Sequence, residues 1–356
     1  MAKPCSSLFF LGKALYNREV ILDEEGERMR TKVLKLLQQA NRAYISDGMI
    51  ADRLGIPRKA VWKHIGELRE MGYRIERAAR NGYVLRETAD LLLPEAIASG
   101  LDTEIVGKHI VHCEVLVSTN PEAKRLAEEG AADGTVVVAE EQTGGHGRRD
   151  RLFFSPHGKG IWCSYILRPT FLPREAPKCT LMAAVAISRA MEAFGIAAEI
   201  KWPNDILHEG KKVVGILTEM RADMDRIRYV VIGTGISVNI GEEEFPKPLR
   251  GVATSLSIIC GEPISRIAFF QAVLHEMDEI YCLVEREGFA SVLSEWRRYS
   301  VTLGQEVRVI DVRGDTAFEG RAADIDEDGA LLVDTAEGRR RVDAGEVSIR
   351  PRACAR

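Results

Sequence analysis

Apolar residues recur with a helical period near the start of the chain and predict three short helices. The apolar stripes of the first and third helices consist of Val33, Leu34 and Leu37, and of Val61, Ile65 and Leu68. Ser46 is suited to cap the middle helix, and Gly55 to end it. Two strand-like runs flank Asn81-Gly82, a turn sequence typical of β-hairpins. Helices followed by a hairpin predict a winged helix-turn-helix domain over residues 29–88.

The middle of the chain alternates strand-like runs with long apolar segments. Residues 136–138 and 230–232 are short β-branched runs, whereas residues 176–194 and 264–284 are apolar enough for core helices. This alternation predicts an α/β domain with a mixed sheet over residues 89–299.

After residue 300 the pattern changes to short strands of alternating polarity, such as residues 306–310 and 330–333. Turn sequences separate them, namely Arg313-Gly314-Asp315, Asp328-Gly329 and Glu337-Gly338. About fifty residues of this kind are typical of a small barrel, so we expect an SH3-like β-barrel over residues 300–352. The whole chain is therefore expected to be a multidomain α+β protein.

The composition is that of globular domains. The 356 residues are 46% hydrophobic and 29% charged, which fits two or three domains of ordinary size. The longest apolar run is well short of the roughly 20 residues that a membrane span needs. The seven cysteines include no Cys-x-x-Cys pair, which indicates free thiols in a reducing cytoplasm. Because Met29 directly precedes the first helical pattern, we expect residues 1–28 to be a poorly ordered extension or an upstream start.

Charge is distributed unevenly along the chain. The net charge is −4, yet residues 28–87 hold 14 Lys and Arg residues against 6 Asp and Glu residues, a net charge of +8. A basic block on an acidic body predicts a polyanion partner, with an ordinary solvated charged face as the alternative. A small helical protein-interaction domain is the alternative to the winged helix, but the basic charge on the third helix favours the winged helix. The residues that we expect to contact DNA from the third helix are Arg58, Lys59, Trp62, Lys63 and His64.

A loop rich in glycine and arginine follows the run at residues 136–138. It reads Gln142-Thr143-Gly144-Gly145-His146-Gly147-Arg148-Arg149-Asp150-Arg151. Glycines let the backbone approach a ligand, and arginines match phosphate or carboxylate oxygens. The loop therefore predicts an anion site, with a solvated basic surface loop as the alternative. The chain contains no Walker A sequence.

A second motif, Lys201-Trp202-Pro203-Asn204-Asp205, precedes Lys211-Lys212 and a strand-like run at residues 213–217. We expect a hairpin in which Pro203-Asn204-Asp205 ends the first strand. Its three lysines are suited to neutralise a transferring phosphoryl group, and Asp205 to bind Mg²⁺ or orient an amine. A turn with surface lysines is the alternative.

Two weaker signals complete the set. Gly233-Thr234-Gly235 follows the run at residues 230–232, and by itself it favours tight packing. Ser118-Thr119-Asn120 precedes Pro121 and suits a helix N-cap, which is compatible with a binding role.

Together and in this order, the motifs resemble those of the biotin–protein ligase family, and the resemblance covers nearly all of residues 29–350. The N-terminal winged helix is similar to that of the bifunctional class, whose members also repress biotin-synthesis genes. The resemblance implies that biotin and MgATP form biotinyl-5′-AMP, and that the biotinyl group then passes to a lysine of a biotin carboxyl carrier domain. It also implies operator DNA as a partner, a homodimer when the adenylate is bound, and no tightly bound prosthetic group.

The resemblance also implies roles for individual residues. Catalytic roles fall to Arg148, Lys201, Asp205 and Lys212, with Asp205 as a candidate Mg²⁺ ligand. Biotin contacts fall to Ser118, Thr119, Asn120, Gln142, His146, Gly147, Arg148, Lys212, Gly215, Gly233 and Gly235. Nucleotide contacts fall to Gly145, Arg149, Arg151, Asn204, Ser237 and Asn239.

The chain departs from the family pattern in its anion loop. The family loop usually reads Gly-Arg-Gly-Arg-Arg-Gly-Arg, whereas here His146 replaces the first arginine and Asp150 the last glycine. A histidine is only partly charged at neutral pH, so we predict weaker retention of the adenylate. Ser237 stands where many members have asparagine. A lipoate-type ligase, and a winged-helix regulator that only senses a small molecule, remain alternative functions.

Overall fold

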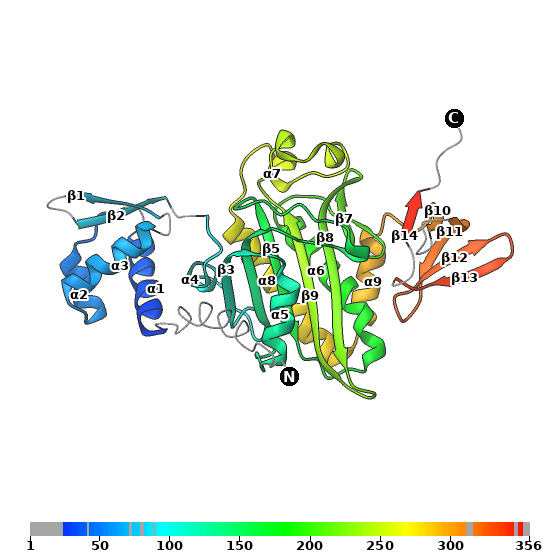
Figure 1. The fold of residues 1–356 in the computed structure, drawn as a ribbon, viewed down its shortest axis with the longest axis horizontal. Coiled ribbons are helices and arrows are strands. Elements are labelled where there is room, and N and C mark those ends of the chain that lie inside the picture. The colour runs from blue at the N-terminus through cyan, green and yellow to red at the C-terminus, as the bar shows by residue number, and fades with distance from the viewer. Residues whose placement is uncertain are drawn as a thin grey trace, which may run out of the picture. The chain divides into compact units, whose positions relative to one another are not determined.

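The computed structural model describes residues 24–40, 43–70, 73–78, 82–87, 90–310, 316–344 and 348–351. The chain divides into two compact units, residues 1–89 and residues 90–356, which Figure 1 draws as ribbons. Predictions about residues 1–23, Asn81 and Arg313-Gly314-Asp315 lie outside the described residues. Within the described part of the chain, no helix is long and apolar enough to cross a membrane.

The first unit has the predicted three helices and hairpin. Its elements are α1 (Glu24–Gln39), α2 (Asp47–Leu54), α3 (Arg58–Glu70) and the antiparallel strands β1 (Arg74–Ala78) and β2 (Gly82–Glu87). Helix α1 begins at Glu24, inside the predicted extension. Ser46 accepts a hydrogen bond from the Met49 amide, and Gly55 ends α2 with a φ of 65°, both as predicted. The six residues of the predicted apolar stripes are at most 1% exposed, so the two stripes form the core of this unit.

The second unit contains a seven-stranded mixed sheet in the order β3-β4-β5-β9-β8-β7-β6. The strands are β3 (Ile110–Leu116), β4 (Thr135–Gln142), β5 (Gly160–Leu167), β6 (Glu199–Lys201), β7 (Asp205–His208), β8 (Lys211–Ala222) and β9 (Ile227–Ser237). Only the β3–β4 pair is parallel among these described strands. The prediction of a mixed sheet is therefore confirmed.

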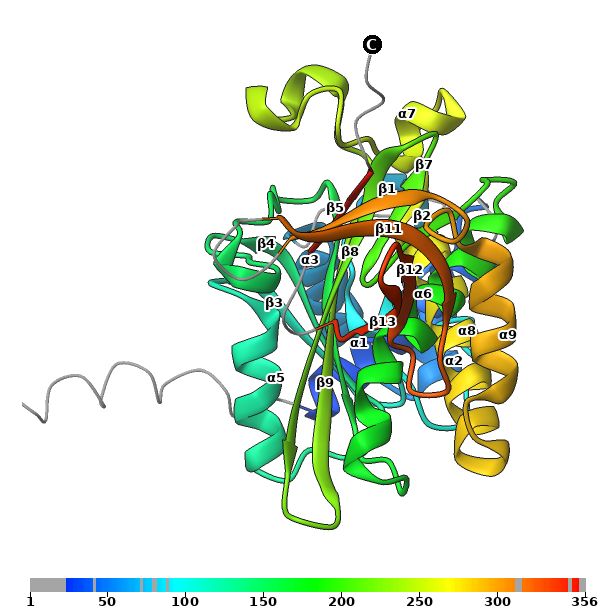
Figure 2. The same ribbon diagram turned by 90° about the vertical axis from the view of Figure 1, so that its right-hand side faces the viewer.

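Helices cover both faces of this sheet, as Figure 2 shows. Helix α5 (Thr119–Glu128) lies on one face, and α6 (Cys179–Ala193), α8 (Arg266–Glu287) and α9 (Ala290–Tyr299) lie on the other. Two shorter helices are α4 (Pro94–Ala98) and α7 (Leu256–Cys260). Because side chains alternate along a strand, Val137 of β4 packs with α5 on one face. Val136 and Val138 lie in the larger core that includes α6 and α8. The predicted helix at residues 176–194 begins only at Cys179, because a 3₁₀ turn occupies Pro173–Lys178.

The prediction of a hairpin over residues 201–217 was wrong about where its strands begin and end. Strand β6 ends at Lys201, the chain turns through a cis Trp202-Pro203 bond, and Asp205 begins β7 instead of ending the strand before it. Strands β7 and β8 form the hairpin. This pairing puts Asp205 and Lys212 on neighbouring strands.

The C-terminal part is a five-stranded antiparallel sheet in the order β13-β12-β11-β10-β14. Its strands are β10 (Glu306–Ile310), β11 (Thr316–Ile325), β12 (Leu331–Thr335), β13 (Gly338–Val342) and β14 (Ser348–Pro351). Its apolar residues join the core of the larger sheet. The Trp202 indole N–H donates to the Gly329 carbonyl over 3.1 Å, so the small sheet contacts the Lys-Trp-Pro-Asn-Asp segment directly. Closure of this sheet into an SH3-like barrel stays a prediction.

Candidate active site

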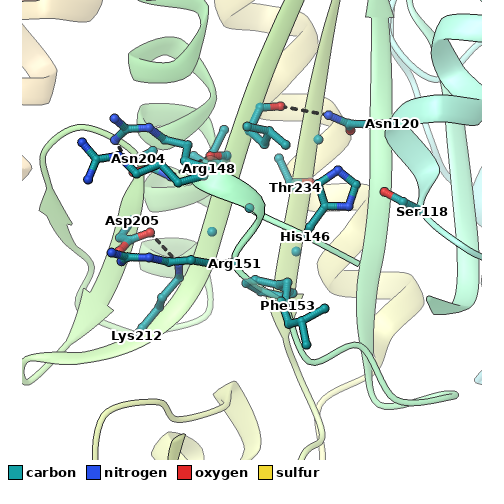
Figure 3. Close-up of a pocket in the computed structure, with 18 of the residues that line it drawn as sticks. Ser118, Asn120, His146, Arg148, Arg151, Phe153, Asn204, Asp205, Lys212 and Thr234 are labelled. Carbon is teal, nitrogen blue, oxygen red and sulfur yellow. Dashed lines mark hydrogen bonds and ion pairs between the residues drawn. The ribbon is translucent and has the colours of Figure 1, made fainter. Parts of the chain in front are cut away.

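Four segments far apart in the sequence surround one cavity of about 210 Å³ (Figure 3). They are the start of α5, the Gly/Arg loop after β4, the β6–β8 segment and the middle of β9. The predicted site residues that line it are Ser118, Thr119, Asn120, Gln142, His146, Gly147, Arg148, Arg149, Arg151, Lys201, Asn204, Asp205, Lys212, Gly215, Gly233 and Gly235. Gly145, Ser237 and Asn239 are not among the lining residues.

The Ser-Thr-Asn triplet begins α5, as its sequence predicts, but its side chains do not cap the helix. Ser118 occupies the N-cap position without a side-chain cap hydrogen bond in the described structure. Instead the Thr119 amide donates to Gln142 Oε1 over 2.9 Å. Gln142 Nε2 in turn donates to Ser155 Oγ over 3.0 Å. The helix start is thereby fastened to the end of β4, and the polar residues of both segments face one end of the cavity.

Gly233 and Gly235 allow two side chains to lie flat against β9. A Cβ atom at Gly233 would lie 2.1 Å from Asn120 Oδ1, and one at Gly235 would lie 2.4 Å from Phe153 Cε1. No side chain larger than hydrogen fits at these distances. The tight-packing interpretation of the Gly-x-Gly motif is therefore confirmed.

The Gly/Arg loop gathers positive charge at the other end of the cavity. Arg148 donates to Asn204 Oδ1 over 3.3 Å and to the carbonyl of Ala344, which lies just after β13. Burial, followed by the nearby charges of Arg149 and Arg151, lowers the pKa of Arg148. Arg149 has a φ of 58°, a strained conformation for a residue other than glycine. Mutual repulsion among these guanidinium groups is relieved by a bound anion, so the loop suits a phosphate.

A lysine and a carboxylate face each other beside this loop. Lys212 Nζ lies 2.6 Å from Asp205 Oδ1 and 5.5 Å from the centre of the Phe153 ring. Lys201 also lines the cavity, whereas Lys211 is exposed at the surface. Two of the three lysines of this motif therefore reach the site.

The described residues do not form a magnesium centre of their own. No group of three potential His, Cys, Asp or Glu ligands occurs in the part of the chain that the structure describes. The Asp205 carboxylate is paired with the Lys212 ammonium. Asp205 alone therefore does not fit as the protein anchor for Mg²⁺.

Several residues that line the cavity were not predicted from the sequence as site residues. Phe153 and Leu152 follow the Gly/Arg loop, Trp202 lies within the second motif, and Thr234 lies between the two glycines. The available signal for Phe153 was its position two residues after Arg151, directly behind the Gly/Arg loop. Asn239, predicted to contact nucleotide, exchanges two hydrogen bonds with the Ile264 backbone at 2.8 and 3.0 Å.

The predicted DNA-contacting residues separate into two groups. Arg58, Lys59, Trp62 and Lys63 are exposed on α3. His64 is only 6% exposed, and its Nδ1 lies 3.0 Å from Glu67 Oε2. His64 therefore belongs to the packing of this unit, not to its exposed face.

The comparisons with known proteins cover all three parts of the chain. An HTH domain model matches residues 30–84, the biotin/lipoate A/B protein ligase family residues 113–237, and the biotin protein ligase C terminal domain residues 302–350. The bifunctional ligase/repressor BirA of Bacillus subtilis is 42% identical over 322 residues, which cover 90% of this chain and 98% of that protein. The chain belongs to the bifunctional biotin ligase/repressor family.

A second bifunctional ligase/repressor and a solved biotin protein ligase extend the similarity. The bifunctional ligase/repressor BirA of Escherichia coli is 30% identical over 90% of this chain and 96% of its own length. A biotin protein ligase from Aquifex aeolicus, solved in complex with biotin and ATP, superposes with a TM-score of 0.60 at 29% identity. That superposition covers 69% of this chain and 100% of the solved chain.

Proposed function

We propose that this protein is an ATP-dependent biotin–protein ligase and a biotin-responsive transcriptional repressor. The observation that carries the ligase half is one cavity whose two ends differ in chemistry. Neutral polar groups around Ser118 and Asn120 line one end, and the arginine loop with Lys212 lines the other (Figure 3). Such a cavity suits a molecule with a neutral polar head and a carboxylate that meets a nucleoside triphosphate.

In the first half-reaction the biotin carboxylate attacks the α-phosphorus of ATP, and pyrophosphate leaves. No protein nucleophile takes part, so the chain acts by alignment and by stabilising charge. Arg148, Lys201 and Lys212 supply positive charge where negative charge develops. Magnesium enters as part of the MgATP substrate, held mainly by phosphate oxygens.

In the second half-reaction a carrier lysine amine attacks the acyl carbon of the adenylate, AMP leaves, and the amine loses a proton. Asp205 supplies a carboxylate to the cavity, and this carboxylate lies beside the Lys212 ammonium. When Lys212 turns to the ligand, Asp205 becomes available to orient the amine. Asp205→Asn should therefore slow transfer from preformed biotinyl-AMP in a single-turnover assay, and normal transfer would refute this role.

Biotin-dependent exchange of pyrophosphate into ATP tests the ligase proposal. We expect exchange with biotin and none with lipoate. Exchange with lipoate alone would identify a lipoate-type ligase, and no exchange with either acid would favour a regulator that only senses a ligand.

For the repressor half, the exposed basic residues of α3 support binding to operator DNA. Adenylate binding would favour a homodimer whose two helix-turn-helix domains span two half-sites. The partners named here, ATP, a carrier domain and DNA, fit the cytoplasmic location predicted from the cysteines. Footprinting of the protein's own biotin-gene promoter, with and without biotinyl-AMP, tests this half. Protein loaded with adenylate that neither dimerises nor protects the promoter would refute it.

A further inference from the structure

A chain of hydrogen bonds connects the surface of α5 with the polar end of the cavity through Asn120. Lys124 Nζ lies 2.7 Å from Glu219 Oε1, and Asn120 Nδ2 donates to Glu219 Oε2 over 2.9 Å. The same amide nitrogen donates to the Leu217 carbonyl over 3.3 Å, the contact drawn at Asn120 in Figure 3. On its other side, Asn120 Oδ1 lies 2.6 Å from the Ser164 hydroxyl. Asn120 is only 4% exposed, so these partners determine its orientation.

The partners fix which end of the Asn120 amide carries hydrogens. A carboxylate and a backbone carbonyl only accept hydrogen bonds, so the amide nitrogen must face Glu219. The amide oxygen then accepts the single hydroxyl hydrogen of Ser164. The Thr119 hydroxyl has two protein oxygens within reach, Ser164 Oγ at 2.7 Å and Gln142 Oε1 at 3.2 Å. With its hydrogen directed to either one, Thr119 Oγ1 presents lone pairs to the cavity.

We propose that Glu219 is a positioning residue that sets the donor and acceptor pattern of the biotin site by orienting Asn120, with Lys124 holding Glu219 in place. This inference rests on the proposed biotin-ligase function. A wall of hydrogen-bond acceptors suits a ligand that offers N–H groups, as the cyclic urea of biotin does. Glu219 does not line the cavity, so it acts through Asn120.

The charge of Glu219 supports this role. Burial opposes its ionisation, but hydrogen bonds from Lys124 and Asn120 outweigh burial and lower its pKa. Glu219 is therefore an ionised acceptor at neutral pH, and an ionised acceptor makes the stronger hydrogen bond to the amide.

Substitutions of Glu219 in the full-length protein test the proposal. Glu219→Leu should raise the Kd and the KM for biotin about tenfold, as expected for loss of one charge-assisted hydrogen bond. The KM for ATP and kcat should stay unchanged. Glu219→Gln keeps an accepting oxygen and should restore biotin affinity to within about threefold of the wild type. A biotin Kd equal to that of the wild type in a folded Glu219→Leu protein would overturn the proposal.

A double-mutant cycle tests whether Glu219 acts through Asn120. In an Asn120→Ala background, Glu219→Leu should have little further effect on biotin affinity, and full additivity would overturn the proposal. A wild-type protein that shows no biotin-dependent exchange would refute the ligase function itself, which is a separate outcome.

Lys124→Met keeps the test available if Glu219→Leu fails to fold. It should raise the KM for biotin about threefold, because Glu219 loses its second partner. Arg125→Met is the matched control, since Arg125 is on the same helix and pairs only with the surface residues Glu122 and Glu129 among the described contacts. The control should leave the KM for biotin unchanged. Equal KM values for the two variants would overturn the proposed part of Lys124.

Discussion

Replacing Arg266 by methionine should destabilise the second unit strongly, because a buried carboxylate would lose its counter-ion. Arg266 is 1% exposed, and its Nη1 lies 2.8 Å from Oε2 of Glu140, which is 0% exposed. Glu140 Oε1 also accepts the Leu92 amide over 2.7 Å and lies 3.3 Å from His112 Nε2. Burial of Glu140 disfavours its charge, but His112, Arg266 and the Leu92 amide outweigh burial and lower its pKa from 4.5 to about 2.

The burial of Glu140 sets the size of the effect. Its pKa, lowered from 4.5 to about 2, corresponds to roughly 3–4 kcal/mol of stabilisation that His112, Arg266 and the Leu92 amide share. Breaking a buried ion pair by removing one partner costs roughly 3–5 kcal/mol. We therefore expect Arg266→Met to lower the free energy of unfolding by about 3 kcal/mol near neutral pH, measured by urea denaturation.

The pH dependence gives an independent check. Because the folded-state pKa of Glu140 is depressed, its stabilisation is present above about pH 4.5 and is lost as the pH falls toward 2. The deficit of Arg266→Met should therefore shrink on acidification. Burial raises the pKa of Asp90, and the charge of Arg266 opposes that rise. Loss of Arg266 raises this pKa further, so Asp90 adds to the same slope.

The double variant Glu140→Leu/Arg266→Met is the matched control. Replacement of both partners by apolar side chains should recover at least about 1 kcal/mol of the loss, because the fully buried carboxylate of Glu140 is removed together with its counter-ion. A loss below about 1 kcal/mol for the single variant, or a double variant no more stable than the single one, would refute the reasoning.

Three further predictions follow from the site and from α3. Gly233→Ala should raise the KM for biotin at least tenfold, because its Cβ would displace Asn120; Gly66→Ala, where a Cβ meets no atom within 4 Å, is the control and should leave ligation unchanged. His146→Arg should slow release of biotinyl-AMP in a rapid-dilution assay, and an unchanged release rate would show that the charge of this residue does not retain the intermediate. Lys63→Met should weaken promoter binding and reduce the slope of log K against log salt concentration by about 0.9. His64→Leu should mainly lower the thermal stability of the first unit. A full loss of DNA binding by a stable His64→Leu protein would contradict the assignment of His64 to packing.

The local motifs could be recognised in the sequence because the residue types in each motif suit one kind of ligand or contact. Arginines between glycines predict an anion site wherever the loop lies, and the structure brings this loop to Lys212 and Asp205. The helix stripes of the first unit were equally clear, since periodicity reports burial directly. The same logic could have identified His64 as inward-facing, because it lies three residues after Val61 and four before Leu68.

Other parts of the site depend on pairing that local sequence does not specify. Glu219 reaches Asn120 only because β8 and β9 pair beside the start of α5. Asn239 resembles a ligand-binding residue in sequence, yet its amide holds the Ile264 backbone. The Ala344 carbonyl that binds Arg148 is a backbone group, and a backbone group leaves no signature in the sequence.

His146 occupies the part of the cavity where its two ends meet, between the polar residues near Ser118 and the charged group around Arg148 (Figure 3). Its Nδ1 donates to the Gly144 carbonyl over 3.1 Å, which ties the ring to its own loop. In the proposed reaction the bond between biotin and phosphate forms at this junction. Arg148, Lys201 and Lys212 still supply charge for that step. Histidine in place of arginine should therefore affect how long the finished adenylate stays bound more than how fast it forms.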